Sequence, residues 1–135
     1  MTSAEDCLSL ALTAKPVSAK SAAFFVRGSG DAIALAQSQG VDPRVMREVL
    51  LGGSGRSFAL ERHGLRILEG DFQPGFRARL MRKDLGIALA TARSAGAELQ
   101  GAELVERLVG ELCDSGRGEM DWNTLAVLVQ EKRRG

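Results

Sequence analysis

Four cations crowd into one short stretch of an otherwise apolar, alanine-rich segment. Arg77, Arg79, Arg82 and Lys83 fall within seven positions, and Asp84 follows directly. The segment has helical periodicity, and the cations fall in its first two turns, where the helix dipole disfavours positive charge. One interpretation is a solvated face. The other is a site for a carboxylate or a phosphate, in which Asp84 orients Lys83.

A second candidate is the glycine- and serine-rich turn Gly52–Ser57, which reads GGSGRS. No Gly-Lys-Ser/Thr sequence follows and no strand precedes it, so it is neither a Walker loop nor a dinucleotide fingerprint. The favoured interpretation is the end of one helix followed by a new N-cap at Ser54 or Ser57. Backbone N–H groups at that helix start, beside Arg56, could still hold an anion.

Other catalytic chemistry has little support. His63 is the single histidine and is expected at the surface. No serine stands in a nucleophile-elbow motif, and no His/carboxylate cluster has metal-binding spacing, so we predict no metal site. Cys7 and Cys113 lie far apart, which predicts two free thiols rather than a disulfide framework.

The charge balance and the apolar runs exclude further classes. Lys and Arg number 18 against 17 Asp and Glu, so the basic excess typical of nucleic-acid binders is absent. The first residues lack a basic region ahead of their apolar stretch, which argues against a signal peptide. No apolar run approaches the ~18 residues of a membrane span. These features predict a cytoplasmic protein with neither nucleic-acid nor membrane partners.

Helices must position the candidate residues, because the apolar period is helical almost throughout. No segment alternates with period two, so no strand is expected. We expect a helix with Asp42 as N-cap and Pro43 at its first position, and a last helix capped by Asp121 or Asn123. The other well-defined helices are predicted at Arg77–Ala95 and Leu99–Cys113.

The N-terminal part of the chain is interrupted by turn-forming residues. Pro16 and the sequence RGSG at 27–30 predict breaks, with helices at about 19–27 and 31–39. A short connecting segment is expected at about 57–63. The predicted fold is an all-α bundle of about six helices, and 135 residues correspond to a single domain over 1–135.

Several motifs in order resemble a known family. They are the Ser54–Ser57 turn, the loop Phe72-x-Pro74-Gly75-Phe76, the helix start LMRKDL at 80–85, a preceding GVDP and a closing GRGEMDWNTLAVLVQ. Over 31–130 the chain resembles the C-terminal helical domain of the β-hydroxyacid dehydrogenases, which is similar to that of 6-phosphogluconate dehydrogenase. The group includes 3-hydroxyisobutyrate dehydrogenase, 2-hydroxy-3-oxopropionate reductase and glyoxylate/succinic semialdehyde reductase. Residues 1–30 form a divergent segment.

The resemblance implies a domain that dimerises and forms one wall of a substrate cleft. It places Phe76, Lys83 and Asp84 against substrate and cofactor, with Lys83 the cofactor contact. These residues and Arg56 would then bind an acidic substrate or a cofactor phosphate. The small residues of 88–95 and 32–36 also favour a homodimer.

The departures from the family matter equally. No GxGxxG occurs in the chain. The family's catalytic lysine falls on Lys15 by an ungapped count, or on Lys20 with a gap, while its Asn pair falls on Ser18 and Ala19. The predicted function is a stand-alone module for dimerisation or small-acid binding, without a cofactor or redox activity of its own. The alternative is the substrate part of an NAD- or NADP-dependent dehydrogenase that works with a separate Rossmann domain, and whether the chain is an enzyme stays open.

Overall fold

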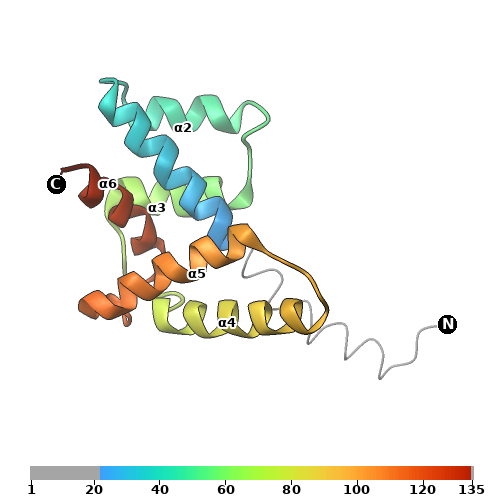
Figure 1. The fold of residues 1–135 in the computed structure, drawn as a ribbon. Helices are drawn as coiled ribbons and strands as arrows, with labels where there is room; N and C mark the ends of the chain where they lie inside the picture. Colours follow the sequence, from blue (N-terminus) through green and yellow to red (C-terminus); the bar gives the residue numbers. More distant parts are fainter. Residues whose placement is uncertain (1–21, 135) are drawn as a thin grey trace.

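The structure, a computed structural model, describes residues 22–134; Lys15 and Lys20 lie outside this range. The described chain is helical and contains no extended strand. One isolated antiparallel bridge joins Arg77 to Asp121. The elements after the first helix, over 22–38, are α2 (Pro43–Leu51), η1 (Ala59–His63), α3 (Gly64–Glu69), α4 (Ala78–Ser94), α5 (Gln100–Leu112), η2 (Cys113–Arg117), η3 (Trp122–Thr124) and α6 (Leu125–Arg134). The predicted all-α bundle is confirmed (Figure 1).

The helix over 22–38 runs without interruption through the sequence Gly28-Ser29-Gly30, so the predicted break there is wrong. The reason is tertiary packing. A Cβ on Gly30 would lie 3.0 Å from both Cα and Cβ of Ala126, so the glycine allows this helix to cross α6 closely. Buried Val26 and Ile33 hold the same helix against the core. This packing offsets the helix-propensity cost of glycine, about 1 kcal/mol per residue.

The α2 helix begins as predicted. The Asp42 carboxylate accepts a hydrogen bond from the Arg44 N–H at 2.8 Å, Pro43 occupies the first turn, and Gly52 ends the helix. Its apolar stripe, however, is not in the core: no side chain of α2 is buried, and Val45 and Val49 are 51% and 68% exposed.

The short segment expected at 57–63 is the first part of a longer helical segment. The Ser57 hydroxyl accepts a hydrogen bond from the Leu60 N–H at 3.0 Å, which confirms an N-cap after the GGSGRS turn. The π-helical η1 passes directly into α3, and Gly70 ends α3 in the left-handed conformation, with φ of 68°. Burial of Leu60 and Ile67 stabilises this segment, which lacks a long apolar period of its own.

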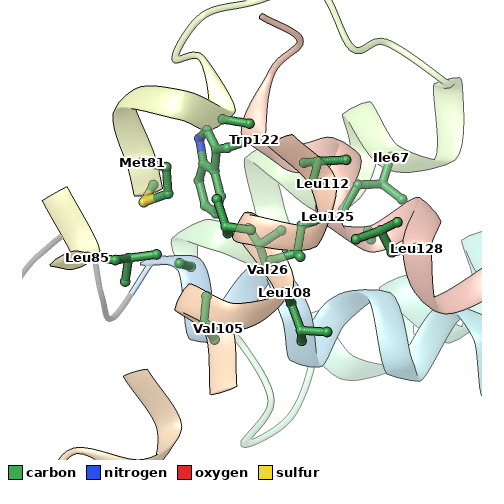
Figure 2. Packing of buried hydrophobic residues seen from close by; sticks show 14 of the residues in the cluster. Val26, Ile67, Met81, Leu85, Val105, Leu108, Leu112, Trp122, Leu125 and Leu128 are labelled. Atoms are coloured by element: carbon green, nitrogen blue, oxygen red, sulfur yellow. The ribbon is translucent and has the colours of Figure 1, made fainter. Parts of the chain in front are cut away.

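Helices α4 and α5 lie side by side, and α6 packs on α5 (Figure 1). Their bounds agree with the predicted ones to within one or two residues. Figure 2 shows the shared core, in which Trp122 stands beside Met81. The buried side chains come from every described helix except α2 and η2. The core residues labelled there are Val26, Ile67, Met81, Leu85, Val105, Leu108, Leu112, Trp122, Leu125 and Leu128.

Two stretches of small residues, at 32–36 and 88–95, are partly used inside this chain. Ala34, Ala36 and Ala88 are each less than 10% exposed, whereas Ala90 and Ala95 are exposed. Close helix packing within the bundle therefore accounts for much of the first stretch and for one end of the second. No helix in residues 22–134 has the length and apolar character to span a bilayer.

Candidate functional site

The outer face of α4 collects residues that the sequence singled out. The helix places Met81, Leu85 and Ala88 in the core, so Lys83 lies on the opposite, exposed side and Asp84 at the flank. Lys83 is exposed and Asp84 is half-buried. Phe76 lies two residues before the helix and is 36% exposed, and Lys83 is about 7.5 Å along the helix axis from Ala78.

The cations around Lys83 have carboxylate partners. Arg77 forms an ion pair with Glu119, with Nε 3.0 Å from Oε2, and Arg79 pairs with the same carboxylate. Arg82 lies 3.2 Å from Asp114 and 3.7 Å from Glu106. Each of these arginines is therefore engaged with the segments that flank α4, which explains why a helix start tolerates so much positive charge.

Lys83 differs from its neighbours. No residue of 22–134 forms an ion pair or a side-chain hydrogen bond with it, and none joins it to Asp84. An exposed ammonium group without a carboxylate partner can bind an anionic ligand with no competing acidic side chain. It is the chemically available cation on this face.

Arg56 lies elsewhere. Arg56 follows α2, and α2 lies on the side of the molecule away from α4 (Figure 1). The guanidinium of Arg56 donates to Glu61 at 2.7 Å. It lines a hollow of about 290 Å³ together with Phe24, Phe25 and Leu50. Lys83 and Asp84 thus lie on α4, Phe76 lies two residues before this helix, and Arg56 lies on a different part of the chain.

The loop before α4 is held by a carboxylate whose wider role the sequence did not reveal. Asp121 is 1% exposed. Its Oδ2 accepts hydrogen bonds from the backbone N–H groups of Gly75, at 2.9 Å, and Phe76, at 3.1 Å. Its Oδ1 accepts from the Asn123 N–H at 3.0 Å, which is the predicted capping role. The first pair of bonds ties the loop over 71–76 to η3.

Arg66 completes this attachment. Its Nη1 lies 3.4 Å from Oδ2 of Asp121, its Nε donates to Asp71 at 3.0 Å, and its Nη2 donates to the Gln73 carbonyl oxygen at 2.6 Å. The hydrogen bond to Asp71 is the main cause that raises the pKa of Arg66, and the same bond lowers the pKa of Asp71. One guanidinium therefore joins α3, the loop and η3.

His63 is not the surface residue that the sequence predicted. Its ring lies 5.0 Å from the ring of Trp122, edge-on at 64°, and its Nδ1 is buried without a hydrogen-bond partner. Burial lowers the pKa of His63; the charge of Asp121 opposes this shift, and the charges of Arg66 and Arg62 add to it.

The described residues form no candidate metal site and do not include Lys15. In the range 22–134, no three His, Cys, Asp or Glu side chains gather as a metal site would require. Lys15 lies outside the described residues, so its distance from α4 is not defined.

The helical arrangement is found in solved structures. The crystal structure of 3-hydroxyisobutyrate dehydrogenase from Salmonella typhimurium superposes with a TM-score of 0.80 at 24% identity, over 86% of this chain and 41% of that one. The class of fold is therefore the helical domain of such a dehydrogenase.

The sequence comparisons identify the family. A family model described as "NAD-binding of NADP-dependent 3-hydroxyisobutyrate dehydrogenase" matches residues 13–129. Among curated proteins, 2-hydroxy-3-oxopropionate reductase of Escherichia coli is 30% identical over 80% of this chain, and mitochondrial 3-hydroxyisobutyrate dehydrogenase of Drosophila melanogaster is 27% identical over 78%. The chain belongs to the 3-hydroxyisobutyrate dehydrogenase family. It spans 37% and 35% of the length of these two relatives.

Proposed function

We propose that this chain is a single helical domain that binds a small acid on the outer face of α4. The observation that carries the proposal is Lys83, an exposed cation without a carboxylate partner among residues 22–134, while the three arginines near it are paired. A carboxylate or phosphate arriving at this face forms a charge-assisted hydrogen bond with Lys83 without first displacing an acidic side chain.

The neighbouring residues have complementary roles in this proposal. Asp84, the next residue on α4, accepts a hydrogen bond from a ligand hydroxyl. Phe76 supplies an apolar wall at the start of α4. Arg56 is a weaker candidate for the same site, since it is engaged with Glu61 and lies away from α4. Binding alone needs no cofactor on this chain.

The alternative is that the same face belongs to a complete NAD- or NADP-dependent dehydrogenase. This alternative is favoured because the relatives are a reductase and a dehydrogenase, and because the chain spans only 37% and 35% of their length. Exposed Lys83 and Phe76 suit a dinucleotide, because a cation binds a phosphate and an aromatic ring packs on a planar base or nicotinamide. The cofactor would supply the hydride. Lys15 would hold the proton that the substrate carbonyl oxygen receives.

Calorimetry on the purified chain tests the binding proposal, with 3-hydroxyisobutyrate and glycerate as probes. We expect Lys83→Ala to weaken binding by about tenfold or more, the loss of one hydrogen bond to a charged group. The matched control is Lys132→Ala, which removes the same charge from α6, where Lys132 pairs with Glu111 at 2.7 Å. Equal affinities of wild type and Lys83→Ala would remove Lys83 from the site.

An NADPH oxidation assay separates the two functions. The purified chain is mixed with NADPH and 2-hydroxy-3-oxopropionate. The module proposal expects no turnover, whether or not a separately produced Rossmann domain of a relative is added. The alternative expects turnover only when that domain is added. Turnover by the pure chain would overturn the module proposal.

We also propose that two copies of the chain associate. The support comes from large apolar side chains left exposed on the helix over 22–38, on α2 and at the start of η1. Exposed apolar side chains in this number are typical of a protein–protein interface.

A further inference from the structure

The side chain of Phe76 is partly exposed, so its position depends in part on its backbone. It is 36% exposed and makes no ring contact with another aromatic residue of the described chain. Its N–H donates to Oδ2 of Asp121 at 3.1 Å, and its carbonyl oxygen accepts from the Trp122 N–H at 3.0 Å. Both backbone groups of Phe76 are thus bonded to two consecutive residues 45 or more positions along the chain.

The carboxylate at the centre of this arrangement is fixed in turn. Asp121 is 1% exposed, and its two oxygens accept four hydrogen bonds, from three backbone N–H groups and from Arg66. A buried carboxylate accepts that many bonds only in one orientation. The Cβ that Gly75 lacks would lie 3.5 Å from Oδ2, so the loop backbone approaches the carboxylate closely.

We infer that Asp121 and Arg66 are positioning residues that set the placement of Phe76 just before α4, the helix that carries Lys83. The inference rests on the proposed function, in which Phe76 and Lys83 contact the same small acid. Asp121 fixes the backbone of Phe76, and Arg66 fixes Asp121 while it holds Asp71 and Gln73 of the same loop. Neither residue contacts the ligand.

The first test is independent of any ligand. Amide hydrogen exchange of Gly75 and Phe76, measured by NMR, should accelerate about tenfold or more in Asp121→Asn, because an amide group offers one acceptor oxygen where the carboxylate has two. The amides of α5, around Val105 and Leu108, should exchange as in wild type. Unchanged exchange at Gly75 and Phe76 would overturn the inference.

A milder variant keeps the inference falsifiable if Asp121→Asn does not fold. Arg66→Lys retains the charge at a partly exposed position but cannot bond Asp71, Gln73 and Asp121 together. We expect faster exchange at Gly75 and Phe76 in it. The matched control is Arg47→Lys. Arg47 also makes several hydrogen bonds, to the backbone oxygens of Leu60 at 3.2 Å and Glu61 at 2.6 Å. The variant Arg47→Lys should leave the exchange of the loop amides unchanged, and equal effects of the two variants would contradict the inference.

Calorimetry with 3-hydroxyisobutyrate then separates positioning from general destabilisation. Asp121→Asn should weaken binding about as much as Phe76→Ala, and the double variant should bind no worse than Phe76→Ala alone. Additive losses would show that Asp121 acts other than through Phe76. If wild type binds no acid, the proposed function fails, while the exchange measurements still decide whether Asp121 and Arg66 position the loop.

Discussion

The imidazole of His63 lies in surroundings that favour its neutral form. It packs edge-on against Trp122, and its buried Nδ1 has no partner to stabilise an added proton. Among the charges around it, Asp121 favours protonation, whereas Arg66 and Arg62 disfavour it, and burial outweighs Asp121. The same carboxylate that holds the loop at Phe76 therefore also moderates the pKa of His63.

We predict that His63 titrates below its ordinary pKa of 6.5 in the folded chain. The unfolded chain then binds its proton at a higher pH than the folded chain does. As a result, this contribution to stability is complete above about pH 6.5 and is lost as the pH falls through the lower folded value. His63 is the single histidine, so one imidazole resonance in an NMR titration reports its midpoint.

The variant His63→Phe is the control for this titration. It keeps a ring against Trp122 and should abolish the histidine contribution to the pH dependence of thermal unfolding between about pH 5 and 7. A folded-state midpoint at or above 6.5 would contradict the prediction.

At the scale of elements, the close crossing of the helix over 22–38 and α6 depends on one glycine. Gly30 is buried, with Ala126 at 3.0 Å from the position of an added Cβ. Gly28, two residues earlier in the same helix, is exposed, and an added Cβ there has nothing within 4 Å. The two positions share a helix and a residue type and differ in packing.

We predict opposite effects of alanine at these two positions. Gly28→Ala should raise the free energy of unfolding by about 0.5–1 kcal/mol, because alanine has the higher helix propensity. Gly30→Ala should lower it by about 1–3 kcal/mol, since the overpacking against Ala126 exceeds that gain. Urea denaturation at one pH and one protein concentration measures both. Stabilisation by both variants would show that the helices do not cross this closely.

The elements that the sequence predicted well are those with local signals. Asp42, Pro43 and Gly52 define α2, and long apolar periods define α4 and α5, so short-range physics suffices for them. The continuity of the helix over 22–38 was not predictable in this way, because Gly30 in a helix is explained only by Ala126. The helical segment that starts after Ser57 was predicted too short for a similar reason: burial stabilises it more than its own periodicity does.

The candidate site divides along the same line. Lys83 and Asp84 are neighbours on α4 but point about 100° apart around its axis, and the family resemblance singled them out. Which cation remains unpaired depends on Glu119 and on residues of α5 and η2, far along the sequence. The attachment of the loop by Asp121 and Arg66, 55 residues apart, likewise has no local signal. The sequence predicted only the capping half of the role of Asp121.

The distribution of exposed apolar side chains is uneven over the whole described molecule. Most of the large ones lie on the helix over 22–38, on α2 and just after it, and α2 buries none of its own stripe in the core. They are Phe24, Phe25, Leu35, Val41, Val45, Val49 and Phe58. An amphipathic helix normally buries its apolar stripe, and the stripe of α2 is exposed to water in a single copy. We therefore expect a second copy to cover this surface.

We predict a dimer at micromolar concentration in analytical ultracentrifugation, and a monomer for the double variant Val49→Asp and Phe58→Asp. These side chains are 68% and 69% exposed, so the aspartates cost little within one chain but place desolvated charges in an interface. Leu104→Asp, at a position 41% exposed on α5, is the control and should leave the dimer intact. A wild-type monomer would contradict the prediction. A dimer that survives the double variant but not Leu104→Asp would move the interface from α2 to α5.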